Sequence, residues 1–152
     1  MRKSPYFLLI ILLTGFDQLT KLLANVYLDM GTSVDINPFF SLVLAYNYGA
    51  AFSFLADQDG WQQYFLSSIS AIASIVIGVW MAKTLVEHRL KLISLTFILS
   101  GAVGNMIDRM ANGFVVDFIH LYYQDFHWPI FNFADIFISV GVLLLIIADW
   151  KK

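Results

Sequence analysis

Four long runs of apolar residues divide the chain, and polar residues gather between them. The runs cover residues 6–24, 64–82, 92–110 and 133–150. Each is close to the roughly 20 apolar residues that a helix needs to cross the hydrocarbon core of a bilayer. The first run follows Met-Arg-Lys, as a signal peptide would, but it ends in polar residues rather than in a cleavage site of small residues. The pattern therefore predicts an all-α membrane protein with four transmembrane helices, the first of them uncleaved.

The two longer connections, residues 25–63 and 111–132, have a different pattern. Apolar residues alternate with others in two short stretches, Val34 and Ile36 and then Phe40, Leu42, Leu44 and Tyr46. This period of two favours β-strands. Pro38 and Gly49 interrupt the pattern. Both connections are rich in Tyr, Trp and Phe, and Tyr and Trp favour the membrane–water boundary. We expect a small β-sheet on the outer membrane surface, accompanied by a short outer helix or loop region.

The positive charges predict the orientation of the helices. Seven of the nine Lys and Arg residues lie before the first run, between the second and third, or after the fourth: Arg2, Lys3, Lys83, Arg89, Lys91, Lys151 and Lys152. The connections 25–63 and 111–132 contain neither residue type. Because cytoplasmic segments carry the excess of Lys and Arg, we expect both termini in the cytoplasm and both long connections outside it.

Composition supports a membrane protein and narrows its chemistry. The 152 residues are enough for one domain, and they are 59% hydrophobic and 13% charged, whereas a soluble domain has about 25% charged residues. The net charge of −2 indicates no basic surface for nucleic acid. The absence of cysteine removes disulfides, thiolate metal ligands and cysteine nucleophiles.

Nine Asp, Asn, Lys and Arg residues associated with the spans fall near one depth. Given the orientation above, they lie near the outer ends of the helices or in the outer connections: Asp17, Lys21, Asn47, Asn105, Asp108, Arg109, Asp117, Asn132 and Asp135. Some have simple structural interpretations. Asp17 and Lys21 are spaced to pair on one helix face, and Asn132 is suited to cap a helix whose dipole favours Asp135. However, charge within a membrane costs about 2.5–3.5 kcal/mol per residue at a helix centre. A whole layer of such groups therefore predicts a functional site.

Carboxylates are the reactive groups that this layer offers in number. The three histidines do not form an H-E-x-x-H motif, so we predict no metal or other cofactor. Two carboxylates that share one proton can hydrolyse an amide, because close approach separates their pKa values. Asp117 and Asp135 are placed for this role, and Asp17 with Asp108 fits the same observations. An alternative function is a small proton-coupled transporter, although its relay should continue into the inner halves of the spans, where acids are nearly absent.

Five short motifs resemble the lipoprotein signal peptidase (signal peptidase II) family, in the order of that family and over nearly the full chain. They are DQLTK (17–21), NYGAAFS (47–53), GNMIDR (104–109), VVDF (115–118) and FNFAD (131–135). The resemblance implies that residues 1–152 form a single integral-membrane peptidase domain. It implies an aspartic endopeptidase of the bacterial inner membrane, which removes the signal peptide of prolipoproteins by cutting before a diacylglyceryl-modified cysteine.

The resemblance also implies roles for individual residues. Asp117 and Asp135 fall on the catalytic aspartates of the family. Four residues fall on positions that bind substrate or order the site: Asn47, Asn105, Arg109 and Asn132. Asp17, Lys21 and Asp108 are expected to give structural support. The implied partners are the diacylglyceryl-modified prolipoprotein, membrane lipids and inhibitors of the globomycin type.

Overall fold

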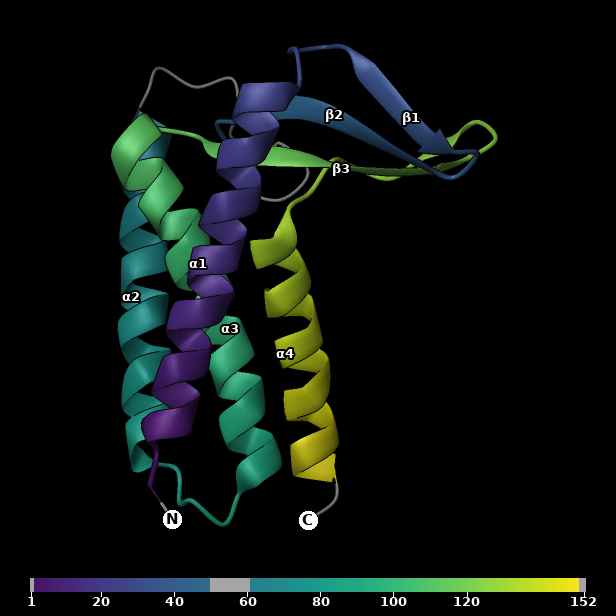
Figure 1. Ribbon diagram of the computed structural model, residues 1–152. Coiled ribbons are helices and arrows are strands. Elements are labelled where there is room, and N and C mark those ends of the chain that lie inside the picture. Colours follow the sequence, from purple (N-terminus) through teal and green to yellow (C-terminus); the bar gives the residue numbers. More distant parts are fainter. Residues whose placement is uncertain (1, 50–60, 151–152) are drawn as a thin grey trace.

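Four long helices and a four-stranded sheet form the protein in a computed structural model, which describes residues 2–49 and 61–150 apart from the side chains of residues 62 and 63 (Figure 1). The helices are α1 (Ser4–Tyr27), α2 (Trp61–Lys83), α3 (Arg89–Asn112) and α4 (Phe133–Trp150). Each contains a segment long and apolar enough to cross a membrane. The four predicted spans lie inside these helices, which confirms that part of the prediction.

Helix α3 is the centre of the bundle. It packs against α1, α2 and α4, and its contact with α4 is the most extensive between any two elements. Glycine makes this contact close. A Cβ atom at Gly101 would overlap the carbonyl oxygen of Ala134, and one at Gly141 would lie 2.8 Å from the carbonyl oxygen of Ser94. Small residues let membrane helices approach in this way, and at Gly101 the start of α4 lies against the middle of α3.

Large apolar side chains cover the outward faces of the helices. Ile11 is 67% exposed on α1, Ile75 66% on α2 and Leu143 58% on α4. In water such continuous apolar surface would promote association. Lipid is the solvent that suits it, and the apolar stretches of α1, α2 and α4 are indeed little buried inside the protein.

The sheet has the order β1-β2-β3-β4 and is antiparallel throughout. Its strands are β1 (Ser33–Asn37), β2 (Phe40–Asn47), β3 (Val115–Tyr123) and β4 (Phe126–His127). The two strands predicted from the alternating residues are confirmed as β1 and β2. Residues 50–60 of the first outer connection lie outside the described residues. The predicted short outer helix or loop region is therefore not tested there.

Strand β3 was not predicted, because both alternating stretches lie in the connection 25–63. Its sequence VVDFIHLYY is rich in β-branched and aromatic residues, which favour strands. It pairs with β2, so that Ala45 lies opposite Asp117. Gly113, in the left-handed conformation with φ +81°, ends α3 and donates its N–H to the carbonyl of Arg109. That cap turns the chain directly from α3 into β3.

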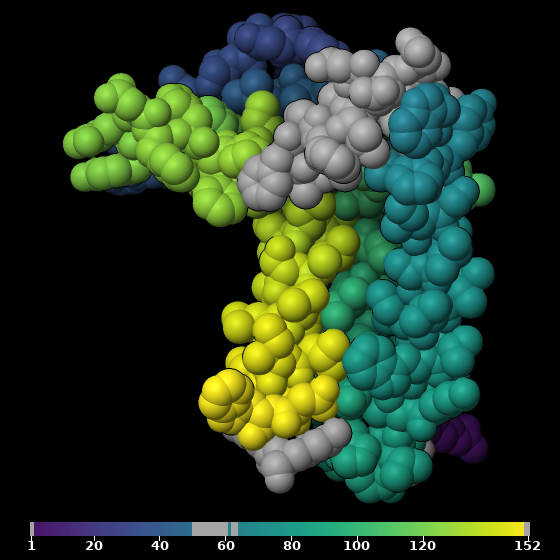
Figure 2. All heavy atoms as spheres, turned by 180° about the vertical axis from the view of Figure 1, so that it is seen from behind, coloured from purple at the N-terminus to yellow at the C-terminus, as the bar shows by residue number. Residues whose placement is uncertain are grey.

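The sheet and the chain termini lie at opposite ends of the molecule (Figure 1). The N- and C-terminal ends lie together at the far end of the bundle, whereas the sheet crosses the other end and projects sideways beyond α4. Figure 2, from behind, shows the same overhang beside α4, drawn in yellow. A cluster of buried residues joins the sheet to the bundle; it contains Ala24, Leu44, Val116, Phe118 and Ile119.

Candidate active site

The polar residues predicted to share one depth meet where the bundle joins the sheet. The described members come from all these elements: α1 carries Asp17 and Lys21, β2 ends at Asn47, α3 carries Asn105, Asp108 and Arg109, β3 carries Asp117, and Asn132 and Asp135 lie at the start of α4. Part of the NYGAAFS motif, residues 50–53, lies outside the described residues. The predicted layer is thus one connected network rather than a set of separate interfacial ions.

Asp117 is a buried carboxyl group held by two asparagines. Its side chain is in β3, and the residue is only 3% exposed. The carboxamide of Asn132 donates to Asp117 Oδ1 at 2.6 Å, and that of Asn47 donates to Oδ2 at 3.1 Å. Burial raises the pKa of Asp117 to about 7, and the nearby charge of Asp135 contributes to the rise, against the lowering effect of the two asparagine hydrogen bonds. This carboxyl group can therefore hold a proton near neutral pH.

Asp135 is mounted in the first turn of α4 by a capping box. Asn132 Oδ1 accepts the backbone N–H of Asp135 at 3.0 Å, and Asp135 Oδ2 accepts the backbone N–H of Asn132 at 3.2 Å. The remaining oxygen, Oδ1, accepts the Asn105 carboxamide at 2.8 Å. The helix-cap interpretation of Asn132 is therefore confirmed, and the same cap holds the carboxylate of Asp135 in place.

The two carboxylates face one cavity of about 380 Å³, lined by Asn47, Asn105, Arg109, Val115, Asp117, Trp128, Pro129, Ile130, Phe131, Asp135, Ile138 and Ser139. Asp135 is half-buried, so one member of the pair reaches the open part of the site. Asn132 contacts both carboxyl groups. Within the described residues, neither Asp117 nor Asp135 forms a direct ion pair. Two acids that share a cavity without a paired cation are suited to share a proton.

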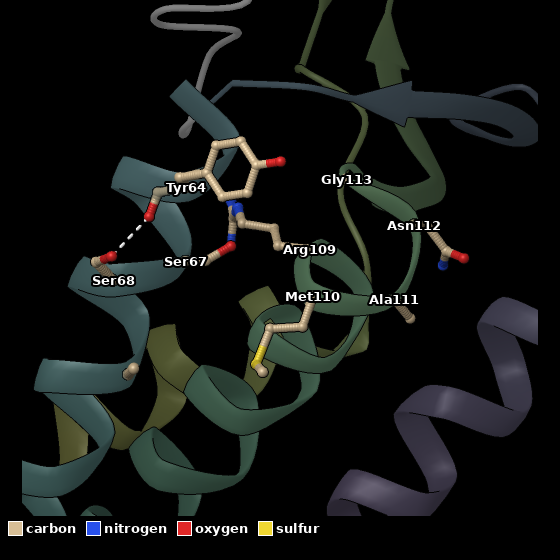
Figure 3. Close-up of a pocket in the computed structure, with 9 residues that line it drawn as sticks. Tyr64, Ser67, Ser68, Arg109, Met110, Ala111, Asn112 and Gly113 are labelled. Carbon is tan, nitrogen blue, oxygen red and sulfur yellow. Dashed lines mark hydrogen bonds between the residues drawn. The ribbon is translucent and has the colours of Figure 1, made fainter. Parts of the chain in front are cut away.

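Arg109 links this cavity to its neighbours. It donates to the carbonyl of Gly49 at 3.3 Å, and it lines the cavity of the two carboxylates. Its side chain extends from α3 toward Tyr64 and Ser67 of α2, where it borders a second cavity of about 600 Å³ (Figure 3). Arg109 also borders an apolar groove of about 320 Å³ between α2, α3 and α4.

The other carboxylate pair left open by the sequence, Asp17 with Asp108, has a different environment. Lys21 Nζ lies 2.9 Å from Asp17 Oδ2 and 2.9 Å from Asp108 Oδ2. Asp17 Oδ1 accepts the backbone N–H of Ala134, and Asp108 Oδ2 accepts that of Val116. This pair is bridged by an ammonium group and ties α1 and α3 to α4 and β3.

Gln18 belongs to the same cluster and is not among the predicted site residues. Its amide nitrogen donates to Asp108 Oδ1 at 2.9 Å and to the carbonyl of Gly104 at 3.1 Å, and it lies 3.2 Å from Asp17 Oδ2. The only signal in the sequence was its place inside DQLTK, three residues before Lys21 and so on the same helix face.

Comparison with known families and structures agrees with this geometry. A family model described as signal peptidase (SPase) II matches residues 9–151. The chain belongs to the signal peptidase II family. The match covers most of α1, the other three helices and the sheet, so family membership applies to the whole layer of polar residues.

Relatives and solved structures are similar over most of their lengths. A lipoprotein signal peptidase of Francisella tularensis subsp. novicida is 46% identical over 148 residues, which are 97% of this chain and 92% of the relative. One from Acinetobacter baumannii is 45% identical over 86% of this chain and 74% of its own. Two structures described as a bacterial membrane enzyme solved by the in meso method, at 31% identity, have TM-scores of 0.84 and 0.85. They cover 97% and 98% of this chain and 88% and 94% of their own.

Proposed function

We propose that the protein is an aspartic endopeptidase that removes the signal peptide from prolipoproteins, cutting before a diacylglyceryl-modified cysteine. Asp117 and Asp135 are its catalytic pair. The observation that carries the proposal is that both carboxyl groups line one cavity and are held by the same residue, Asn132. Membership of the signal peptidase II family supports the choice of substrate.

The raised pKa of Asp117 supports a division of labour within the pair. Asp117 carries the shared proton and donates it toward the carbonyl oxygen of the scissile peptide bond. Asp135 accepts a proton from the attacking water, and the new C–O bond forms as the carbonyl becomes a tetrahedral intermediate. The proton held by Asp135 then passes to the amide nitrogen, the C–N bond breaks, and Asp117 regains its proton from the intermediate. General acid and base catalysis of this kind is worth about 10²–10⁴ in rate.

The apolar groove supports a helical, membrane-embedded substrate. It shares Asn105, Arg109 and Ile138 with the cavity of the dyad. A signal helix that occupied the groove would reach the carboxylates at its outer end. There the chain must be extended to be cut, and Arg109 with the asparagines can hydrogen-bond its free peptide groups. The aromatic overhang of the sheet, which includes Trp128, would lie next to the lipid on the cysteine.

The charge distribution supports location in the bacterial inner membrane with both termini cytoplasmic and the site at the extracytoplasmic face. Both ends of the chain lie opposite the sheet (Figure 1), and the basic residues between α2 and α3 belong to that same end. The transporter alternative has no comparable support. Among the described residues, the buried ionisable groups are Asp17, Lys21, Asp108 and Asp117, all near the sheet, and a proton relay needs groups through the membrane.

Incubation of the purified protein in detergent with a diacylglyceryl-modified prolipoprotein tests the function directly. We expect one cut, before the modified cysteine, and mass analysis of both products identifies the bond. The matched control is the same precursor without the diacylglyceryl group, which should be cut at least about tenfold more slowly if the overhang binds lipid. No cleavage of the modified precursor, or cleavage elsewhere, would contradict the proposal.

Inhibition gives a second test of the same site. A globomycin-type inhibitor should block cleavage and protect the protein against thermal unfolding, because we expect it to occupy the cavity of the dyad. Binding that survives Arg109→Ala and Asp135→Asn with unchanged affinity would place the inhibitor elsewhere.

A further inference from the structure

Lys21 makes one contact that an internal ion pair does not explain. Its residue is 2% exposed, and its ammonium group has three N–H donors. Two point to Asp17 and Asp108 at 2.9 Å. The third donates to Asn105 Oδ1, also at 2.9 Å. The first two contacts neutralise charge, but the third reaches the residue that holds Asp135.

The contact with Lys21 determines which way the Asn105 carboxamide points. A carboxamide has an accepting oxygen at one end and a donating nitrogen at the other, and an ammonium group can only donate. Asn105 must therefore turn Oδ1 toward Lys21, and its Nδ2 then donates to Asp135 Oδ1 at 2.8 Å. In the reversed orientation, a donor would face the ammonium and an acceptor would face the carboxylate. Both contacts would become unfavourable at once.

The same orientation extends to the other carboxyl group. Asn105 Oδ1 also accepts Asn132 Nδ2 at 3.3 Å, and this nitrogen donates to Asp117 Oδ1 at 2.6 Å. Asn132 Oδ1 is occupied by the backbone N–H of Asp135. The partner of each amide end thus fixes whether that end is the oxygen or the nitrogen. A chain of hydrogen bonds leads from Lys21 through the two asparagines to Asp117 and Asp135.

We propose that Lys21 is a positioning residue for the reaction: its ammonium group orients the Asn105 carboxamide and, through it, both carboxyl groups of the dyad. Lys21 contacts neither Asp117 nor Asp135 directly and is not itself a catalytic residue. The inference goes beyond structural support and rests on the proposed function, because it requires Asp117 and Asp135 to be the reacting pair.

The substitution Lys21→Met tests this role, since methionine keeps most of the apolar stem and removes all three donors. Per folded molecule, we expect kcat to fall about 10–100-fold, because small displacements of catalytic groups have effects of this size, with KM within twofold. The pH profile should also change. Burial raises the pKa of Asp117 and the charge of Lys21 lowers it, so loss of that charge should move the decline of kcat at high pH to still higher pH.

Asp17→Asn is the matched control, because Asp17 contacts Lys21 in the same buried cluster but bonds to neither asparagine. It should lose thermal stability while kcat and the pH profile stay within twofold of wild type. If Lys21→Met does not fold, the double variant Lys21→Met/Asp17→Asn keeps the net charge of the cluster and still removes the donor to Asn105. This double variant should show the same decrease in kcat, about 10–100-fold, as expected for Lys21→Met.

A double-mutant cycle separates the proposal from a general structural effect. If Lys21 acts through Asn105, Lys21→Met should cost nothing further in kcat when Asn105 is already alanine. Additive losses would overturn the proposal, as would a folded Lys21→Met protein with wild-type kcat and pH profile. Asp135→Asn in the same series separates the proposed dyad from the proposed role of Lys21. Retained turnover in Asp135→Asn would refute the dyad. Lost turnover in Asp135→Asn together with wild-type turnover in Lys21→Met would refute only the role of Lys21.

Discussion

Two pairs of aspartates lie next to each other where the bundle meets the sheet, and their surroundings differ. Asp17 and Asp108 share Lys21, and Gln18 donates to both of them. Asp117 and Asp135 share Asn132 instead, and they line a cavity of about 380 Å³. Neutral amides hold the second pair in place without cancelling its charge.

On the proposed function, one residue type serves two purposes in this protein. Removing one partner of a buried ion pair strongly destabilises a protein. The pair around Lys21 therefore helps to hold α1, α3, α4 and β3 together. A carboxyl pair without a direct ion pair can share one proton, which we assign to Asp117, and this arrangement suits acid–base chemistry. The contrast between a neutralised pair and a reactive pair can be tested by substitution on each side.

The largest effect is expected from the reactive pair. Asp117→Asn and Asp135→Asn should each reduce turnover at least about 10³-fold, because an amide can neither hold nor accept the shared proton. Both proteins should remain folded in detergent, since asparagine keeps the size of the side chain. Cleavage of the diacylglyceryl-modified precursor and thermal unfolding measure the two properties. Turnover within tenfold of wild type in either variant would contradict the assignment.

The neutralised pair should respond in the opposite way. Asp17→Asn leaves Lys21 with less compensation inside the protein, and breaking a buried pair costs about 3–5 kcal/mol. The free energy of unfolding, measured in mixed micelles with SDS, should fall by that order while kcat of the folded protein stays within twofold. Lost turnover at unchanged stability would instead move Asp17 into the reactive group.

Close packing of α3 on α4 keeps both pairs in register. Gly101→Ala would place a Cβ atom against the carbonyl oxygen of Ala134, the residue before Asp135. Overpacking of this kind costs about 1–3 kcal/mol, and the displaced start of α4 should lower turnover as well. Gly78→Ala is the matched control, because a Cβ there meets no atom within 4 Å. Equal effects of the two substitutions would show that helix propensity, and not the α3–α4 contact, decides the result.

The pH dependence of stability should test the raised pKa of Asp117. Burial raises the pKa of Asp117 from its ordinary value of 3.8 to about 7. Between these values the unfolded chain loses the proton while the folded protein keeps it, so stability falls as pH rises through this window. Asp117→Asn removes this penalty. Its stability relative to wild type should therefore improve by about 2–3 kcal/mol between pH 5 and pH 8, and a difference independent of pH would refute the raised pKa.

The smallest effect is expected from an ion pair at the opposite end of the bundle. Lys91 Nζ lies 3.1 Å from Asp149 Oδ1, with side chains that are 15% and 43% exposed. Ion pairs near the surface contribute about 0–1 kcal/mol, and Lys91 Nζ also lies 4.8 Å from the centre of the Trp80 ring, so Lys91→Met should lower stability by about 1 kcal/mol or less and leave turnover unchanged. A loss as large as that of Asp17→Asn would mean that location in the bundle, rather than burial, sets the value of an ion pair here.

Hydropathy and charge along the chain determined a large part of this fold. The four spans and the strands β1 and β2 follow from the length and period of apolar residues, which reflect the surroundings of each segment. The single depth of the polar groups follows from the same pattern. The cap of α4 was also readable, because Asn132 and Asp135 are three residues apart and interact within one turn.

Only the tertiary structure decided which of these polar groups meet. Lys21 and Asn105 are 84 residues apart, and Asn47 and Asp117 are 70 apart. Apolar patterns give the depth of a residue in the membrane, but they do not say which helix faces which neighbour. That choice depends on packing, as at Gly101, and on the pairing of β3 with β2, which the pattern in the connection 111–132 did not predict. Residue patterns alone therefore left two carboxylate pairs open, and only the family resemblance favoured Asp117 with Asp135. The structure adds a physical difference between the pairs, because one ammonium group bridges Asp17 and Asp108.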